Sequence, residues 1–193
     1  AALGALAACG ALVEDAGASW GALYLRTEVG VGAAAGGLAF LALSVAMTVG
    51  RLTGDRVVDR YGQQRVALAG GAAITVGMGA ALAVPSLATA VLGFGLAGLG
   101  VATLVPAVMH TADELPGLAP GLGLTVVSWL LRVGFLVSPA VVGLVADATS
   151  LRVALLSAVV AGLGVLLLGR SLSAVPEGGA GTAAAAGPTS AER

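Results

Sequence analysis

Long apolar segments separated by short polar ones run through this chain of 193 residues. A helix needs about 20 predominantly apolar residues to cross the hydrocarbon core of a bilayer, and several segments have about that length. They cover residues 1–25, 29–49, 66–84, 87–109, 122–145 and 153–168. The pattern predicts an all-α membrane protein with six transmembrane helices within residues 1–170.

The breaks between these segments carry residues that end and start helices. Trp20 and Tyr24, near the end of the first segment, favour the membrane–water interface. Pro85 favours a turn, after which Ser86 can cap the next helix. The most polar stretch, residues 51–65, is expected to be a solvated loop, and further loops are expected around His110 to Gly121 and Asp147 to Arg152. Residues 171–193 mix Gly, Ala, Ser and Pro without periodicity, which predicts a disordered cytoplasmic tail.

Composition supports the membrane assignment and excludes several classes of function. Hydrophobic residues make up 58% of the chain and charged residues 10%, whereas a soluble domain carries about 25% charged residues. The net charge is −1 and no basic tail is present, which argues against a nucleic-acid partner. A single cysteine and a single histidine cannot form a disulfide framework or a zinc cluster of these residues, so we expect no metal and no cofactor.

The distribution of arginines predicts the orientation in the membrane, because positively charged loops stay on the cytoplasmic side. Six spans put both ends of the chain on one side. That side would carry Arg51, Arg56, Arg60, Arg65, Arg170 and Arg193, and the other side Arg26 and Arg152. We therefore expect an integral, multi-pass protein of the plasma (inner) membrane with both ends in the cytoplasm.

Two short motifs known from enzymes have simpler interpretations. Residues 93–98, GFGLAG, match the dinucleotide fingerprint, which works only where a strand turns into a helix. Inside an apolar span, small residues instead favour close helix packing. Residues 17–21, GASWG, match a nucleophile elbow, but His110 is expected on the opposite side of the membrane from Ser19. We therefore expect no enzymatic activity.

Three charged residues within the apolar segments form the candidate site. Glu14, Asp15 and Arg132 lie well inside their predicted spans, where an unpaired charge costs about 2.5 to 3.5 kcal/mol on insertion scales. We expect them to face a watery cavity, or Arg132 to pair with one of the acids. Glu14 and Asp15 would then be protonatable or substrate-binding groups, and Arg132 their partner or a contact for an anion. The alternative is that the two acids lie nearer the end of their span and serve no function.

Residues 54–65, between the second and third spans, read GDRVVDRYGQQR. They resemble the cytoplasmic loop signature of the major facilitator superfamily, Gly-x-x-x-Asp-Arg/Lys-x-Gly followed by basic residues. The departures are Asp55 at the place of the first glycine, and Gln63 and Gln64 in place of basic residues. The resemblance implies that a cytoplasmic gate contains Asp55, Arg56, Asp59, Arg60, Gly62 and Arg65.

Two other segments are similar to particular helices of one branch of that family. Residues 14–25, EDAGASWGALYL, resemble an acidic segment in the seventh helix of bacterial fucose-permease-like members, with Ser19 where those often carry an aspartate. Residues 134–143 resemble their eleventh helix. The resemblance implies the C-terminal six-helix half of a twelve-helix transporter, with a missing N-terminal half as its partner.

These observations together favour secondary active transport of a small organic solute by alternating access. A proton could be transported together with the solute. The site would lie near the membrane midplane, between this half and the missing one. The alternative is a six-helix membrane protein that does not transport, or a subunit that only assembles with others. Sequence upstream of Ala1 encoding six more spans would favour the half-transporter, and a start codon there a free-standing protein.

Overall fold

The computed structural model describes residues 2–113, 119 and 121–170, and the regular structure in these residues is helical. The predicted disordered tail, residues 171–193, lies outside the described residues. As predicted, six helical rods are long and apolar enough to cross a membrane. They are Ala2–Thr27, Ala33–Tyr61, Gln63–Ala83, Leu87–Asp113, Leu122–Ala148 and Leu151–Leu168.

Four of the six rods contain a local change in helix geometry. The first rod consists of α1 (Ala2–Asp15), a π-helical turn η1 (Ala16–Trp20) and α2 (Gly21–Thr27). The second consists of α3 (Ala33–Gly36) and α4 (Leu38–Tyr61), and the third is α5 (Gln63–Ala83). The fourth consists of α6 (Leu87–Ala102) and α7 (Leu104–Asp113), and the fifth is α8 (Leu122–Ala148). The sixth consists of α9 (Leu151–Ala154) and α10 (Leu156–Leu168).

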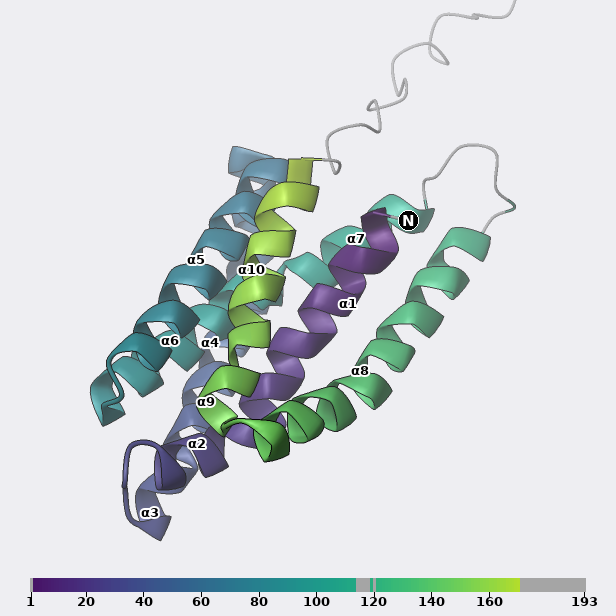
Figure 1. The fold of residues 1–193 in the computed structure, drawn as a ribbon. Helices are drawn as coiled ribbons and strands as arrows, with labels where there is room; N and C mark the ends of the chain where they lie inside the picture. The colour runs from purple at the N-terminus through teal and green to yellow at the C-terminus, as the bar shows by residue number, and fades with distance from the viewer. Residues whose placement is uncertain (1, 114–118, 120, 171–193) are drawn as a thin grey trace, which may run out of the picture.

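The rods pack as an up-and-down bundle in which α5 lies between α6 and α10, and α4 packs on α6 (Figure 1). Helix α1 contacts α8 and α10, while α8 leans away from the rest of the bundle (Figure 1). Helices α4 and α8 leave many large apolar side chains exposed, among them Phe40, Leu52, Trp129, Leu136 and Leu144. These two helices therefore carry much of the apolar surface that the described chain does not cover.

Glycines allow α5 and α6 to approach within backbone contact. A Cβ atom on Gly70 would lie 2.5 Å from the carbonyl oxygen of Gly100, which no real side chain tolerates. A Cβ atom on Gly93 would likewise meet the carbonyl oxygen of Gly77. This is the small-residue packing used between membrane helices, so the interpretation of residues 93–98 as a packing motif is confirmed.

The expected loop at residues 51–65 is wrong, because the chain is helical through almost all of it. Helix α4 continues to Tyr61 and α5 begins at Gln63, leaving Gly62 as the turn with a φ of +83°. Only glycine adopts this left-handed conformation without strain. Charged residues are compatible with a helix wherever their side chains reach water, so the change from apolar to polar marks the edge of the membrane and not the end of the helix. The predicted loop from His110 also starts too early, since α7 continues to Asp113.

Two other local predictions have opposite outcomes. Helix α5 ends just before Pro85, and Ser86 caps α6 as predicted: its Oγ accepts a hydrogen bond of 3.1 Å from the Thr89 N–H, and its own N–H donates to Thr89 Oγ1. The assignment of Tyr24 to the membrane interface is wrong. Its side chain is completely buried, and its hydroxyl donates to the carbonyl oxygen of Ala81 at 2.6 Å. Tyr24 thus joins α2 to α5 inside the bundle.

Candidate functional site

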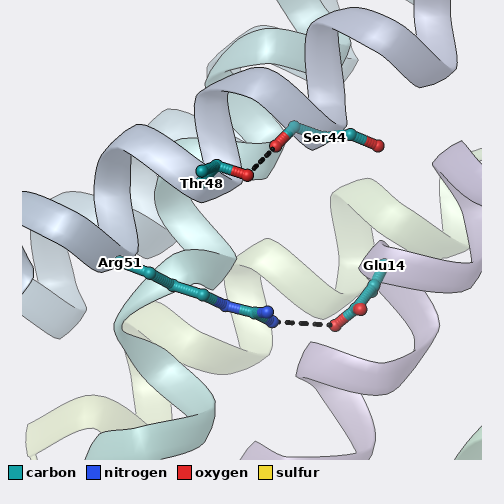
Figure 2. Close-up of polar contacts among 4 residues, drawn as sticks. All are labelled: Glu14, Ser44, Thr48 and Arg51. Carbon is teal, nitrogen blue, oxygen red and sulfur yellow. Dashed lines mark hydrogen bonds and ion pairs between the residues drawn. The ribbon is translucent and has the colours of Figure 1, made fainter.

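An ion pair joins α1 to α4 within the membrane-spanning region. A guanidinium nitrogen of Arg51 lies 3.7 Å from a carboxylate oxygen of Glu14, and Figure 2 shows the Arg51 side chain reaching across to it. This separation is too long for a hydrogen bond. The side chains are 50% and 29% exposed, respectively. The contact is therefore an open ion pair, meaning that its two groups are not hydrogen-bonded to each other and are partly exposed at the surface of the bundle.

Both members of this pair lie far from the ends of their rods. At about 1.5 Å per residue, Arg51 is about 15 Å from Tyr61 and Glu14 about 20 Å from Thr27. The pair is thus held in the part of the bundle where an uncompensated charge is costly.

Polar residues on α4 extend the site by almost two helical turns. Ser44, Thr48 and Arg51 have the spacing of one helix face. The Thr48 hydroxyl donates to the carbonyl oxygen of Ser44 at 2.8 Å, as Figure 2 shows, so its oxygen keeps lone pairs that can accept hydrogen bonds. Ser44 and Thr48 were not among the predicted site residues, although their helical spacing from Arg51 is visible in the sequence.

Asp15 occupies a different environment from Glu14, its neighbour in the chain. Its side chain is buried, with 7% exposure, and accepts hydrogen bonds from Ser19 at 2.6 Å and Ser138 at 2.8 Å. Ser138 belongs to α8, so the carboxylate ties the start of the π-helical turn to another rod. Adjacent helical residues point about 100° apart, which explains why Glu14 turns toward α4 and Asp15 toward α8.

Arg132 is separated from both acids. It is exposed on α8, and among the described residues it forms no ion pair. The expected pairing of Arg132 with a first-span acid is therefore not found; Arg51 pairs with Glu14 instead. The reason lies in the rotation of α8: Gly134 faces α1, where a Cβ atom on it would lie 3.1 Å from that of Ala11. Arg132, two residues earlier, points about 200° away from that direction.

A cavity of about 670 Å³ opens between α4 and the α6–α7 rod, near Gly62. It is lined by Arg51, Gly54, Asp55, Val58, Asp59, Gly62, Gln63, Ala102, Thr103, Pro106, Ala107 and His110. Three of the six predicted gate residues, Asp55, Asp59 and Gly62, therefore line one cavity. The other three, Arg56, Arg60 and Arg65, are exposed and lie outside the lining. Arg51 belongs both to this lining and to the ion pair with Glu14.

Gln63 fixes one wall of this cavity. Its amide nitrogen donates to the carbonyl oxygen of Ala107 at 2.8 Å and to Thr111 Oγ1 at 3.1 Å. These bonds tie the first turn of α5 to α7. In the sequence Gln63 counted only as a departure from the loop signature, so this positioning role was missed.

Comparison with known proteins relates the whole described bundle to transporters. The model of the Major Facilitator Superfamily matches residues 4–191. The chain is 37% identical to the membrane protein MosC of Rhizobium meliloti over 152 residues, covering 79% of this chain and 37% of that protein. It is 32% identical over 143 residues to an uncharacterized MFS-type transporter of Yersinia pestis, covering 74% of this chain and 37% of the relative. The chain thus spans less than half the length of these relatives.

Proposed function

Because the chain belongs to the major facilitator superfamily, we propose that it forms the C-terminal six-helix half of a secondary transporter for a small organic solute. Transport would proceed by alternating access around a site near the midplane. The observation that carries this proposal is the open Glu14–Arg51 ion pair inside a six-helix bundle. This ion pair supports the proposal because charged groups within membrane spans mark substrate and ion pathways.

The incomplete cover of α4 and α8 supports the assignment to one half of a larger bundle. Exposed apolar side chains such as Leu52 and Leu136 have no cover in the described chain, and the relatives are more than twice as long as the matched region. A second six-helix unit packed on these faces would cover them and would enclose Arg132 near the interface. Arg132 would then contact the solute or an acidic group of that unit.

The other predicted site residues receive separate roles. Glu14 would belong to the solute site as the partner that Arg51 releases when solute binds, and Asp15 would be the protonatable group if transport is coupled to protons. Asp55, Arg56, Asp59, Arg60, Gly62 and Arg65 would form the cytoplasmic gate. The cluster of arginines supports a cytoplasmic location for this end of the bundle, in the plasma (inner) membrane, and hence for both ends of the chain.

Uptake by proteoliposomes that contain the complete protein tests this proposal. Radiolabelled small solutes should accumulate in vesicles with the wild-type protein, and accumulation should be lost with Arg51→Gln at equal protein abundance. A correctly inserted protein that moves none of the solutes would favour the alternative, a six-helix membrane protein that only assembles with others.

A further inference from the structure

We infer that the transported solute is a small monocarboxylate, whose carboxylate group takes the place of Glu14 on the guanidinium of Arg51. This inference rests on the proposed transport function and adds the chemical class of the substrate. Three features of the cavity support it: the unmatched donors of Arg51, the route by which they are reached, and the acidic residues beside them.

Arg51 has hydrogen-bonding capacity that the protein does not use. A guanidinium carries five N–H donors, yet within the described part of the chain Arg51 makes only the 3.7 Å contact with Glu14 and donates no hydrogen bond. Its planar fork matches the two oxygens of a carboxylate, and such bidentate pairs are shorter and stronger than ordinary hydrogen bonds. A ligand carboxylate can therefore bind Arg51 better than Glu14 does in this conformation.

The cavity gives access to the cation and not to the acid. Arg51 lines the cavity of about 670 Å³ and is 50% exposed. Glu14 is absent from the lining and is 29% exposed. Among the described residues, Arg51 is the one guanidinium in this lining, so the anionic group of a solute in the cavity would bind there. The volume is within the range of about 300 to 1,000 Å³ that is usual for small-molecule sites.

Two aspartates limit the charge of the solute. Asp55 and Asp59 line the same cavity, on the side toward Gly62. Although Asp55 is one turn from Arg51 on α4, the two form no ion pair in the described structure, because the Arg51 side chain is directed toward Glu14. A second carboxylate on the solute would lie near these aspartates and be repelled. The cavity therefore selects monocarboxylates over dicarboxylates.

The test compares probes of matched size and different charge in proteoliposomes that contain the complete protein. Lactate and gluconate are the monocarboxylates, glycerol and glucose their neutral counterparts, succinate the dicarboxylate and choline the cation. We expect uptake of lactate or gluconate without uptake of the neutral counterparts or choline. Arg51→Gln should abolish this uptake, whereas Arg26→Gln, at the opposite end of the bundle, should leave it unchanged.

Two further variants test the exchange between Glu14 and the solute. Glu14→Gln removes the competing carboxylate and should tighten binding of the transported monocarboxylate about tenfold, the effect of one charge-assisted hydrogen bond. Arg51→Lys keeps a positive charge beside Glu14 but removes the planar guanidinium that can bind a carboxylate through two hydrogen bonds. It should therefore weaken binding of the monocarboxylate about tenfold. Asp55→Asn should allow uptake of succinate.

The outcomes separate this inference from the proposed function. Uptake of glucose, glycerol or choline that is insensitive to Arg51→Lys would leave a transporter whose substrate is not a carboxylate, and would overturn the inference alone. Equal or weaker monocarboxylate binding in Glu14→Gln would overturn the exchange. If the correctly inserted protein moves neither lactate nor gluconate, the inference fails; the proposed transport function fails with it only if none of the wider set of radiolabelled solutes accumulates.

Discussion

The hydroxyl of Ser138 in α8 donates a hydrogen bond of 2.8 Å to the carboxylate of Asp15 at the end of α1, joining residues 123 positions apart. Both side chains are buried. Few other residues of α8 are buried, namely Gly123, Val127 and Val142. The bond therefore helps to fix the position of α8, which otherwise buries few side chains against the bundle.

Replacing Ser138 should loosen α8. Ser138→Ala leaves one oxygen of a buried carboxylate without its partner, which costs about 1 to 3 kcal/mol. We expect a lower melting temperature of the protein purified in detergent. Ser128→Ala is the matched control, because Ser128 is on the same helix and its hydroxyl makes no hydrogen bond with another described side chain. Equal melting temperatures for the two variants would show that the Asp15–Ser138 bond does not stabilise the bundle.

The glycine contact between α5 and α6 should be intolerant of a single methyl group. Gly70→Ala places a Cβ atom 2.5 Å from the Gly100 carbonyl oxygen and should force the helices apart, at a cost of about 1 to 3 kcal/mol. Gly79→Ala, on the same helix, meets no atom within 4 Å and should be neutral or stabilising by less than about 1 kcal/mol. Thermal unfolding in detergent measures both changes. A Gly70→Ala protein as stable as Gly79→Ala would contradict the close packing.

The number and order of the rods could be predicted from the sequence, because the energetic cost of placing polar groups in lipid makes hydropathy decisive over about 20 residues. The lengths of the rods could not be predicted in the same way. At residues 51–65 hydropathy reports the edge of the membrane, whereas a helix ends only where backbone geometry changes, here at Gly62. A polar segment between two spans can therefore be helical almost throughout.

The candidate site was predictable in part. Glu14 and Asp15 could be identified as candidate site residues because they are charged residues inside an apolar span. This identification required no knowledge of tertiary contacts. Their partners depended on how each rod is rotated about its axis, which a sequence without tertiary contacts does not reveal. Arg51 was assigned to the expected loop and was therefore not considered as a partner for Glu14, although α4 carries it to within 3.7 Å of that acid.

Chemical labelling tests the orientation. Cysteines introduced at the exposed residues Tyr61 and Thr149 lie at opposite ends of the bundle. In a Cys9→Ala background, a membrane-impermeant maleimide should label Tyr61→Cys only in inside-out vesicles and Thr149→Cys only in intact cells if the arginine-rich end lies in the cytoplasm, as we propose. Labelling of both positions from one side would contradict the six-span topology, and the reversed pattern would contradict the orientation.

Asp59 should affect the rate of transport more than the affinity for the solute. It is exposed at the Gly62 end of the cavity, about two helical turns from Arg51 on α4, where a gate contact would exist in only one of the two access states. Asp59→Asn should therefore slow uptake about tenfold, equivalent to about 1.4 kcal/mol, while solute binding and membrane abundance stay nearly unchanged. The control is Asp147→Asn, an exposed aspartate at the far end of α8. Equal uptake rates would mean that Asp59 only helps to fix orientation.

Arg51, and not Arg132, should compensate the charge of Glu14. Arg51→Gln leaves this carboxylate unpaired inside the membrane region, so the variant should be less stable than wild type, and adding Glu14→Gln should restore much of the loss. Since both side chains are partly exposed, we expect a coupling energy of about 0.5 to 1 kcal/mol. Arg132 forms no ion pair in the described structure, so Glu14→Gln and Arg132→Gln should have additive effects. Melting temperatures of the singles and doubles in detergent measure both cycles. Coupling of Glu14 to Arg132 with none to Arg51 would mean that the native protein pairs these charges differently, and would remove the basis for the carboxylate site.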